Sequence, residues 1–153
     1  MKRIFKFALI AIVLLFAALQ FVRPDRTNPP VTPADSIEAA TILPDDINSM
    51  LERSCKDCHS NETIHPWYSN ISPFSWFLAD HISEGRRQLN LSIWATYDDR
   101  EKAHKLEEIC EVLEAGEMPL PSYLWIHRDA VLTEGDANTL CSWARSEKAR
   151  LTH

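Results

Sequence analysis

The sequence predicts an all-α fold, a small helical domain that follows an apolar N-terminal helix. The 153 residues suffice for one domain, and 45% hydrophobic with 25% charged residues is a globular composition. Gly occurs three times against nine Pro, too few for the tight turns of a sandwich or barrel. Apolar residues instead recur at helical spacing along the chain.

The charge of the chain is unevenly distributed. Residues 1–23 carry four basic residues and no acidic one, so residues 24–153 carry 12 basic against 22 acidic residues, a net charge of −10. An acidic domain without a basic stripe repels phosphate backbones, so no nucleic-acid partner is expected. Proteins with basic docking surfaces are the expected partners.

Residues 1–23 have the pattern of a signal anchor. Three basic residues among the first six precede an apolar run at 7–22, which is typical of an export signal. No small-x-small cleavage site follows. We therefore expect a single-pass helix in the bacterial cytoplasmic membrane, with the N-terminus inside and the domain in the periplasm. A cleaved periplasmic form is the alternative.

Residues 24–39 form a Pro-rich segment, with prolines at positions 24, 29, 30 and 33 and no hydrophobic period. Such a composition favours an extended, polyproline-like chain. We expect a stiff tether that would hold the domain up to roughly 40 Å from the membrane.

Four helices are expected in the domain, residues 40–146, which precedes a C-terminal tail at 147–153. Each has apolar residues at i, i+3 and i+4. Gly116 supplies a stop for the third helix, and Thr133 with Asp136 forms a capping box for the last. The expected helices run from Pro44 to about 55, from Ser72 to between 85 and 90, from Asp99 to Ala115, and onward from Thr133.

Residues 55–59 read Cys-x-x-Cys-His, a pattern typical of covalent c-type haem attachment. On a helical turn Cys55 and Cys58 lie on one face, where both thiols reach the vinyl groups at one porphyrin edge. His59 falls over the same face and is the expected proximal iron ligand. Two alternatives are less favoured. A thioredoxin-like redox site would need a βαβ context, and the sequence predicts no strands. A zinc site would need four Cys or His ligands, and the other two cysteines, Cys110 and Cys141, are isolated from each other.

Met118 is the expected distal ligand of the iron. It lies in a loop between the helix-stopping Gly116 and two prolines, which would present the thioether rigidly. The alternative distal ligands are histidines at other places in the chain: His65, His81, His104 and His127.

Two further pairs of residues are candidates for a disulfide and for contacts with the haem propionates. Cys110 and Cys141 lie on apolar faces in an oxidising compartment, so a disulfide would close a 31-residue loop and stabilise the fold by roughly 3.7 kcal/mol. Two buried, unpaired cysteines are the alternative. Arg86 and Arg87 are candidate partners of haem propionates, or else a solvated helix end.

The chain resembles the bacterial haem-binding domain family over about residues 40–146. The resemblance is carried by CKDCHSN at the motif, WYSNISPFSW from Trp67, EGRR-x-LN, GEMP and LCSWA. It implies a monohaem c-type domain with thioethers to both motif cysteines, a proximal His59 and a distal Met118. Cys110 and Cys141 also lie where the family pattern has cysteines.

The expected function is one-electron transfer by a membrane-anchored, cytochrome c-like monohaem protein. With His and Met both on the iron, no position is open for a substrate, so catalysis is disfavoured. Two alternatives remain: a haem-based redox or gas sensor with a displaceable distal ligand, and a small haem peroxidase or thiol oxidoreductase.

Overall fold

The computed structural model describes residues 1–151, which form helices and no strand. The all-α prediction is confirmed. Eight α-helices follow one another in this part of the chain: α1 (Lys2–Leu19), α2 (Ile37–Ala40), α3 (Asp45–Ser54), α4 (Lys56–His59), α5 (Phe74–Gln88), α6 (Asp99–Glu114), α7 (Pro121–Leu124) and α8 (Glu134–Leu151). Four short 3-10 helices connect them: η1 (Pro33–Asp35), η2 (Trp67–Asn70), η3 (Leu91–Thr96) and η4 (Arg128–Ala130).

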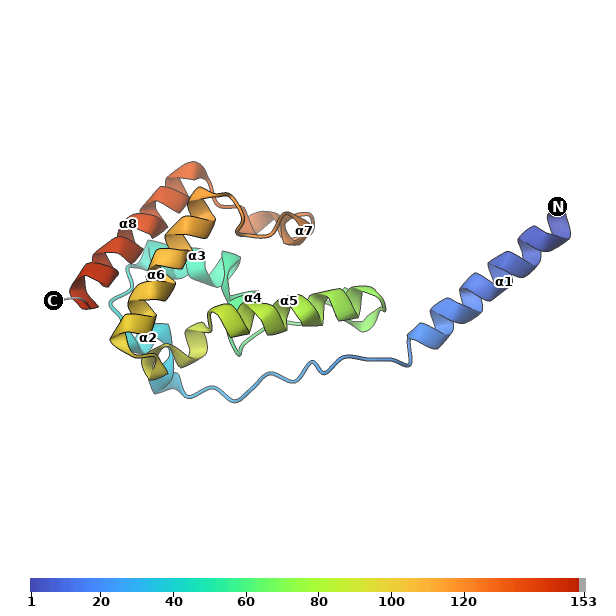
Figure 1. Ribbon diagram of the computed structural model, residues 1–153, viewed down its shortest axis with the longest axis horizontal. Helices are drawn as coiled ribbons and strands as arrows, with labels where there is room; N and C mark the ends of the chain where they lie inside the picture. The colour runs from blue at the N-terminus through green and yellow to red at the C-terminus, as the bar shows by residue number, and fades with distance from the viewer. Residues whose placement is uncertain (152–153) are drawn as a thin grey trace.

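The core lies between α3, α6 and α8, with α6 and α8 side by side along their length (Figure 1). The helical spacing of apolar residues puts one side chain per turn on the facing surfaces. Leu51, Leu106 and Leu140 are at most 1% exposed, and each contributes about 1.5–3 kcal/mol through burial. The four helices expected from the sequence are α3, α5, α6 and α8, whereas the single turns of α2, α4 and α7 are too short to show a period.

Local capping interactions set the ends of the two long core helices. The Asp98 carboxylate accepts a hydrogen bond from the Glu101 N–H (2.8 Å) where α6 begins. Gly116, with φ +67°, follows its end. At the start of α8 the Thr133 N–H donates to Asp136 (2.9 Å), and the Asp136 N–H donates to Thr133 Oγ1 (3.1 Å), which confirms the predicted capping box.

The last helix is longer than the sequence predicted. α8 continues to Leu151, so residues 147–151 are helical rather than a tail, and residues 152–153 lie outside the described part. Two contacts explain the extension. Leu151 packs against the core, and Arg150 pairs with Glu147 one turn earlier (2.8 Å).

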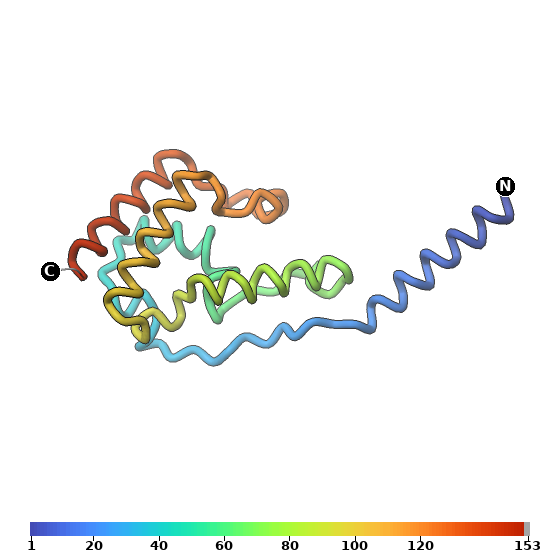
Figure 2. The backbone as a smooth tube through the Cα atoms, viewed as in Figure 1, coloured from blue at the N-terminus to red at the C-terminus, as the bar shows by residue number. Residues whose placement is uncertain are grey.

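The Pro-rich segment is extended only over residues 24–32, because residues 33–35 and 37–39 are helical in η1 and α2, and its extended part is not a free tether. Residues 20–30, which we call the strap, run along α5 and the loop before it (Figure 2). The Gln20 side chain exchanges two hydrogen bonds with the Ser72 backbone (3.0 and 3.2 Å). Trp76 Nε1 donates to the Val22 carbonyl (2.7 Å). The segment is held because its backbone and side-chain polar groups find partners on the domain.

The domain therefore begins earlier than residue 40. Arg26 donates to Asn70 Oδ1 (2.7 Å), and Asn28 donates to the Thr63 carbonyl (3.0 Å). Ile37, on α2, is fully buried and belongs to the core. The segment around Ile37 therefore belongs to the domain through the burial of one isoleucine. A single buried residue produces no hydrophobic period, so the sequence did not predict it.

Helix α1 projects away from the rest of the chain at the end of the strap (Figure 1). Its apolar side chains are exposed, Ile4 to 75% and Leu14 to 64%. Among residues 1–151 no helix combines the length and the apolar character that crossing a membrane requires. The helix predicted from the sequence is present, but its membrane-spanning role is not supported.

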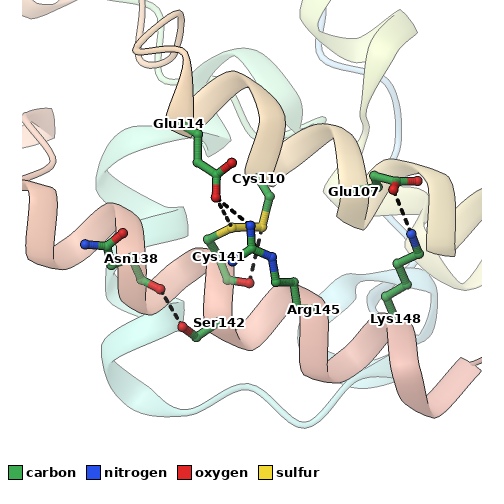
Figure 3. Close-up of a disulfide and its surroundings, with 8 residues drawn as sticks. All are labelled: Glu107, Cys110, Glu114, Asn138, Cys141, Ser142, Arg145 and Lys148. Atoms are coloured by element: carbon green, nitrogen blue, oxygen red, sulfur yellow. Dashed lines mark hydrogen bonds and ion pairs between the residues drawn. A yellow bond between two sulfur atoms is a disulfide. The ribbon is translucent and has the colours of Figure 1, made fainter.

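A disulfide joins Cys110 of α6 to Cys141 of α8 (Figure 3), the pair singled out from the sequence. The two Cα atoms are 4.9 Å apart, within the range that a disulfide requires. Around it, Glu114 pairs with Arg145 (2.5 Å) and Glu107 with Lys148 (3.0 Å) on the surface of the same helix pair. The bridge closes a loop that contains α7 and Met118.

Replacing both cysteines, in Cys110→Ala with Cys141→Ala, is expected to lower the free energy of unfolding by about 3–4 kcal/mol, because the unfolded chain regains the freedom of the open loop. Urea denaturation monitored by circular dichroism measures the change. Arg145→Ala is the control, since breaking an exposed ion pair on the same helices costs at most about 1 kcal/mol. Equal losses in the two proteins would contradict the stabilising role of the bridge.

Candidate haem site

The Cys-x-x-Cys-His motif forms a helical turn of its own. Cys55 ends α3 with a non-helical backbone (φ −123°, ψ −44°) and begins α4. The Cys55 carbonyl then accepts hydrogen bonds from the Cys58 N–H (3.2 Å) and the His59 N–H (2.9 Å). Both thiols are free and half-buried. The turn predicted from the spacing is therefore present, with two unbonded sulfurs one turn apart.

Both thiols are held in the protonated form. Burial, and then the neighbouring Cys58, raise the pKa of Cys55 to about 12. Burial, and then Asp57, raise the pKa of Cys58 to about 11. Thiol oxidoreductases depend on thiolates of lowered pKa, so the electrostatics of this turn disfavour that alternative.

The imidazole of His59 is fixed by a backbone contact. Its Nδ1 lies 3.1 Å from the carbonyl oxygen of Leu89, which follows α5. Burial lowers the pKa of His59, which favours the neutral ring that binds metals. A hydrogen bond from one ring nitrogen to a carbonyl orients the other toward a metal. Two free thiols with one oriented imidazole are the donor set that a covalently attached haem requires.

The motif turn packs directly on the backbone of α5 at Gly85. A Cβ atom at this position would lie 2.7 Å from the Cys58 carbonyl oxygen and 3.1 Å from the Cys58 Cβ. Real Cβ atoms do not approach backbone so closely, and only glycine permits the contact. Sequence reasoning treated Gly85 as part of a helix end and missed this role.

Arg86 holds the loop that follows the motif. Its Nε donates to the Ser60 carbonyl (2.7 Å), and its Nη2 donates to Thr63 Oγ1 (2.9 Å) and to Asn28 Oδ1 of the strap (2.6 Å). Arg87 is exposed and pairs with Glu84. The structure thus gives both arginines protein partners, and their contact with haem propionates stays a prediction.

Met118 is half-buried in the loop after α6. The Gly116 turn is followed by a hydrogen bond from the Glu117 N–H to the Val112 carbonyl (2.9 Å), and Pro121 then begins α7. The loop is therefore anchored to α6 on the N-terminal side of the methionine. Its role as iron ligand stays a prediction.

The four alternative histidines lie in different surroundings. His104 is exposed beside Glu108 (3.4 Å), His81 contacts the Phe77 carbonyl (2.8 Å), and His127 contacts Tyr68. Both ring nitrogens of His65 are buried without a hydrogen-bond partner. Yet His65 lines a cavity of about 250 Å³ between the strap and α5, together with residues such as Arg26 and Ser83 rather than the motif.

An aromatic cluster beside the motif was not predicted from the sequence. Tyr123 Oη donates to Asp57 Oδ2 (2.6 Å), and its ring stacks on His127 (centroids 4.1 Å apart, planes at 8°). His127 Nε2 lies 2.8 Å from Tyr68 Oη. Burial, and then the bond to Asp57, raise the pKa of Tyr123. The spacing of Tyr123 and His127, four residues apart, was the only available signal.

The described residues offer no alternative centre for a bare metal ion. Within residues 1–151 no three His, Cys, Asp or Glu side chains gather closely enough to hold one. The zinc alternative weighed from the sequence therefore gains no support.

Gly85→Ala is expected to lower the free energy of unfolding by about 1–3 kcal/mol, because the new methyl group overlaps backbone of the motif turn. Gly135→Ala is the matched control. Its Cβ would meet only Thr133 Oγ1, at 3.6 Å, and alanine is favoured over glycine in a helix by about 0.5–1 kcal/mol. Thermal unfolding should shift in opposite directions, and a shared direction would argue against the close contact.

Comparisons with known proteins gave one match, to a family model. No curated protein and no solved structure matches the chain. The family model of the haem-binding domain matches residues 14–146, which confirms the resemblance and includes the strap. The matched region contains the two free thiols, the oriented imidazole and Gly85, on which the motif turn packs. The protein belongs to the haem-binding domain family.

Proposed function

We propose that this haem-binding domain is a monohaem c-type cytochrome that transfers single electrons. The observation that carries the proposal is the motif turn, residues 55–59, which presents two free thiols and an imidazole oriented by the Leu89 carbonyl. Cys55 and Cys58 would hold the haem as thioethers, and His59 would bind its iron. Haem iron, when bound, accepts and releases one electron.

The domain carries exposed apolar side chains that could cover an apolar macrocycle. They lie on η2, on the first turn of α5 and just after α7, where Trp67, Phe74 and Trp125 are 75%, 63% and 74% exposed. Both η2 and α4 pack against α5. Binding sites for apolar cofactors are lined by such side chains with a few polar groups.

Met118 is the proposed distal ligand. A thioether on the second axial position would leave no open site for a substrate and would raise the reduction potential relative to two imidazoles. Electron transfer rather than catalysis follows from this ligand set. The acidic domain would steer partner proteins with basic docking surfaces toward it at a salt-dependent rate.

We further propose that α1 directs export, so that the domain works in the periplasm beside the bacterial cytoplasmic membrane. Basic residues in its first turns and the exposed apolar side chains that follow support this role. If α1 is not cleaved, the strap would hold the domain close to the membrane surface instead of at the end of a long spacer.

The central test is covalent haem in protein produced with a haem-maturation system. Wild type should show a c-type pyridine haemochrome spectrum and keep its colour after acid-acetone extraction. Cys55→Ala with Cys58→Ala should lose covalent haem, because no thiol remains to form a thioether. Cys110→Ala with Cys141→Ala is the matched control and should keep it. Extractable haem in the wild type would overturn the proposal.

Met118→Leu is expected to open the iron to external ligands, since leucine has no donor atom. Carbon monoxide should bind the ferrous variant at least tenfold more tightly than the wild type, with haem still attached. Met50→Leu replaces a core methionine that is 7% exposed and serves as the control. CO binding by the wild type itself would favour the sensor alternative.

A further inference from the structure

The segment that carries Met118 is not held in place by apolar burial. α7 contains no buried residue, and Trp125 and Ile126 after it are 74% and 63% exposed. The far end of the segment is tied to α3, where Arg53 donates to the Asp129 carbonyl (2.9 Å) and Ser54 to the Ala130 carbonyl (3.0 Å). Before Met118 the loop is tied to α6 by the Glu117 N–H bond to the Val112 carbonyl (2.9 Å), so the part that needs another anchor is the part that follows Met118.

Tyr123 supplies a direct contact between this part and the motif turn. Tyr123 follows Met118 by five residues, and its hydroxyl donates a hydrogen bond to the Asp57 carboxylate (2.6 Å). The ring is held on its other side by the stacked His127, and Tyr68 of η2 contacts His127 in turn (2.8 Å). Contacts with Asp57, His127 and, through His127, Tyr68 thus hold the phenol of Tyr123 in place.

Asp57 is itself held firmly, because it lies between the two motif cysteines. Its backbone carbonyl accepts a hydrogen bond from Thr63 Oγ1 (2.7 Å), and Thr63 in turn accepts one from Arg86 (2.9 Å). The carboxylate that Tyr123 meets is therefore part of the same fixed turn that carries His59.

We propose that Tyr123 is a positioning residue, whose hydrogen bond to Asp57 holds the Met118 loop against the haem-attachment turn. One turn would then position both residues proposed to hold the iron, His59 directly and Met118 through Tyr123. The inference rests on the proposed function, since it concerns the distal ligand of that haem. Without the hydroxyl, the Met118 loop would leave its position against the motif turn more often, and its thioether would be less available to hold a haem iron.

The experiment compares Tyr123→Phe with Tyr97→Phe in the full, haem-loaded chain. Phenylalanine at 123 keeps the ring that stacks on His127 and removes only the hydroxyl. Tyr97 Oη accepts a hydrogen bond from the Asn90 N–H (3.0 Å), so its loss tests a structural hydroxyl of the same domain. Imidazole is titrated into the ferric protein, and displacement is followed by the long-wavelength band of sulfur-ligated ferric haem.

The imidazole concentration that displaces half of the sulfur ligand is expected to be about tenfold lower in Tyr123→Phe than in wild type. This is the size of effect expected for a lost hydrogen bond to a carboxylate. Tyr97→Phe should match the wild type. Asp57→Ala should give the same increase, and the double variant no further one, as for two groups acting through one contact.

The two proposals fail in different ways. A wild type that keeps covalent haem but shows no sulfur band overturns Met118 ligation and this inference with it. A wild type with the band, whose Tyr123→Phe variant resists imidazole as well as Tyr97→Phe does, overturns this inference alone.

Discussion

The packing of α4 on α5 at Gly85 is the constraint on which the site depends. The missing side chain lets the Cys58 backbone lie against the helix, and this brings the end of α5 close enough for the Leu89 carbonyl to meet His59 Nδ1. The thiols and the imidazole are thereby presented from one turn whose position is set by backbone contacts with α5. Holding binding groups in place in this way lowers the entropy lost on binding.

A second layer of contacts ties the N-terminal strap to this turn. Arg86 lies at its centre and links Asn28 of the strap to the loop after the motif, while Thr63 continues the connection to the Asp57 carbonyl. A guanidinium carries five donors in a fixed plane, which suits a residue that joins three segments. The family match, which begins at residue 14, agrees with a domain that includes the strap.

The α6 and α8 pair forms the frame from which the Met118 loop projects. Core leucines and the disulfide between Cys110 and Cys141 hold the two helices together at a fixed spacing. The loop between them is long and has little apolar burial of its own, so its conformation depends on contacts with distant parts of the chain, at Asp57 and at Arg53.

The features that depend on neighbours a few residues apart could be predicted from the amino-acid sequence. These are the apolar faces of the long helices, the capping box at Thr133, the stop at Gly116 and the motif turn, because helical periodicity and capping act within one or two turns. The contacts between distant segments became visible only in the folded chain: Cys58 with Gly85, His59 with Leu89, Tyr123 with Asp57, and the strap with the domain. These leave no periodic trace, since a single hydrogen bond or missing methyl group at one position depends on where the chain as a whole places its partner.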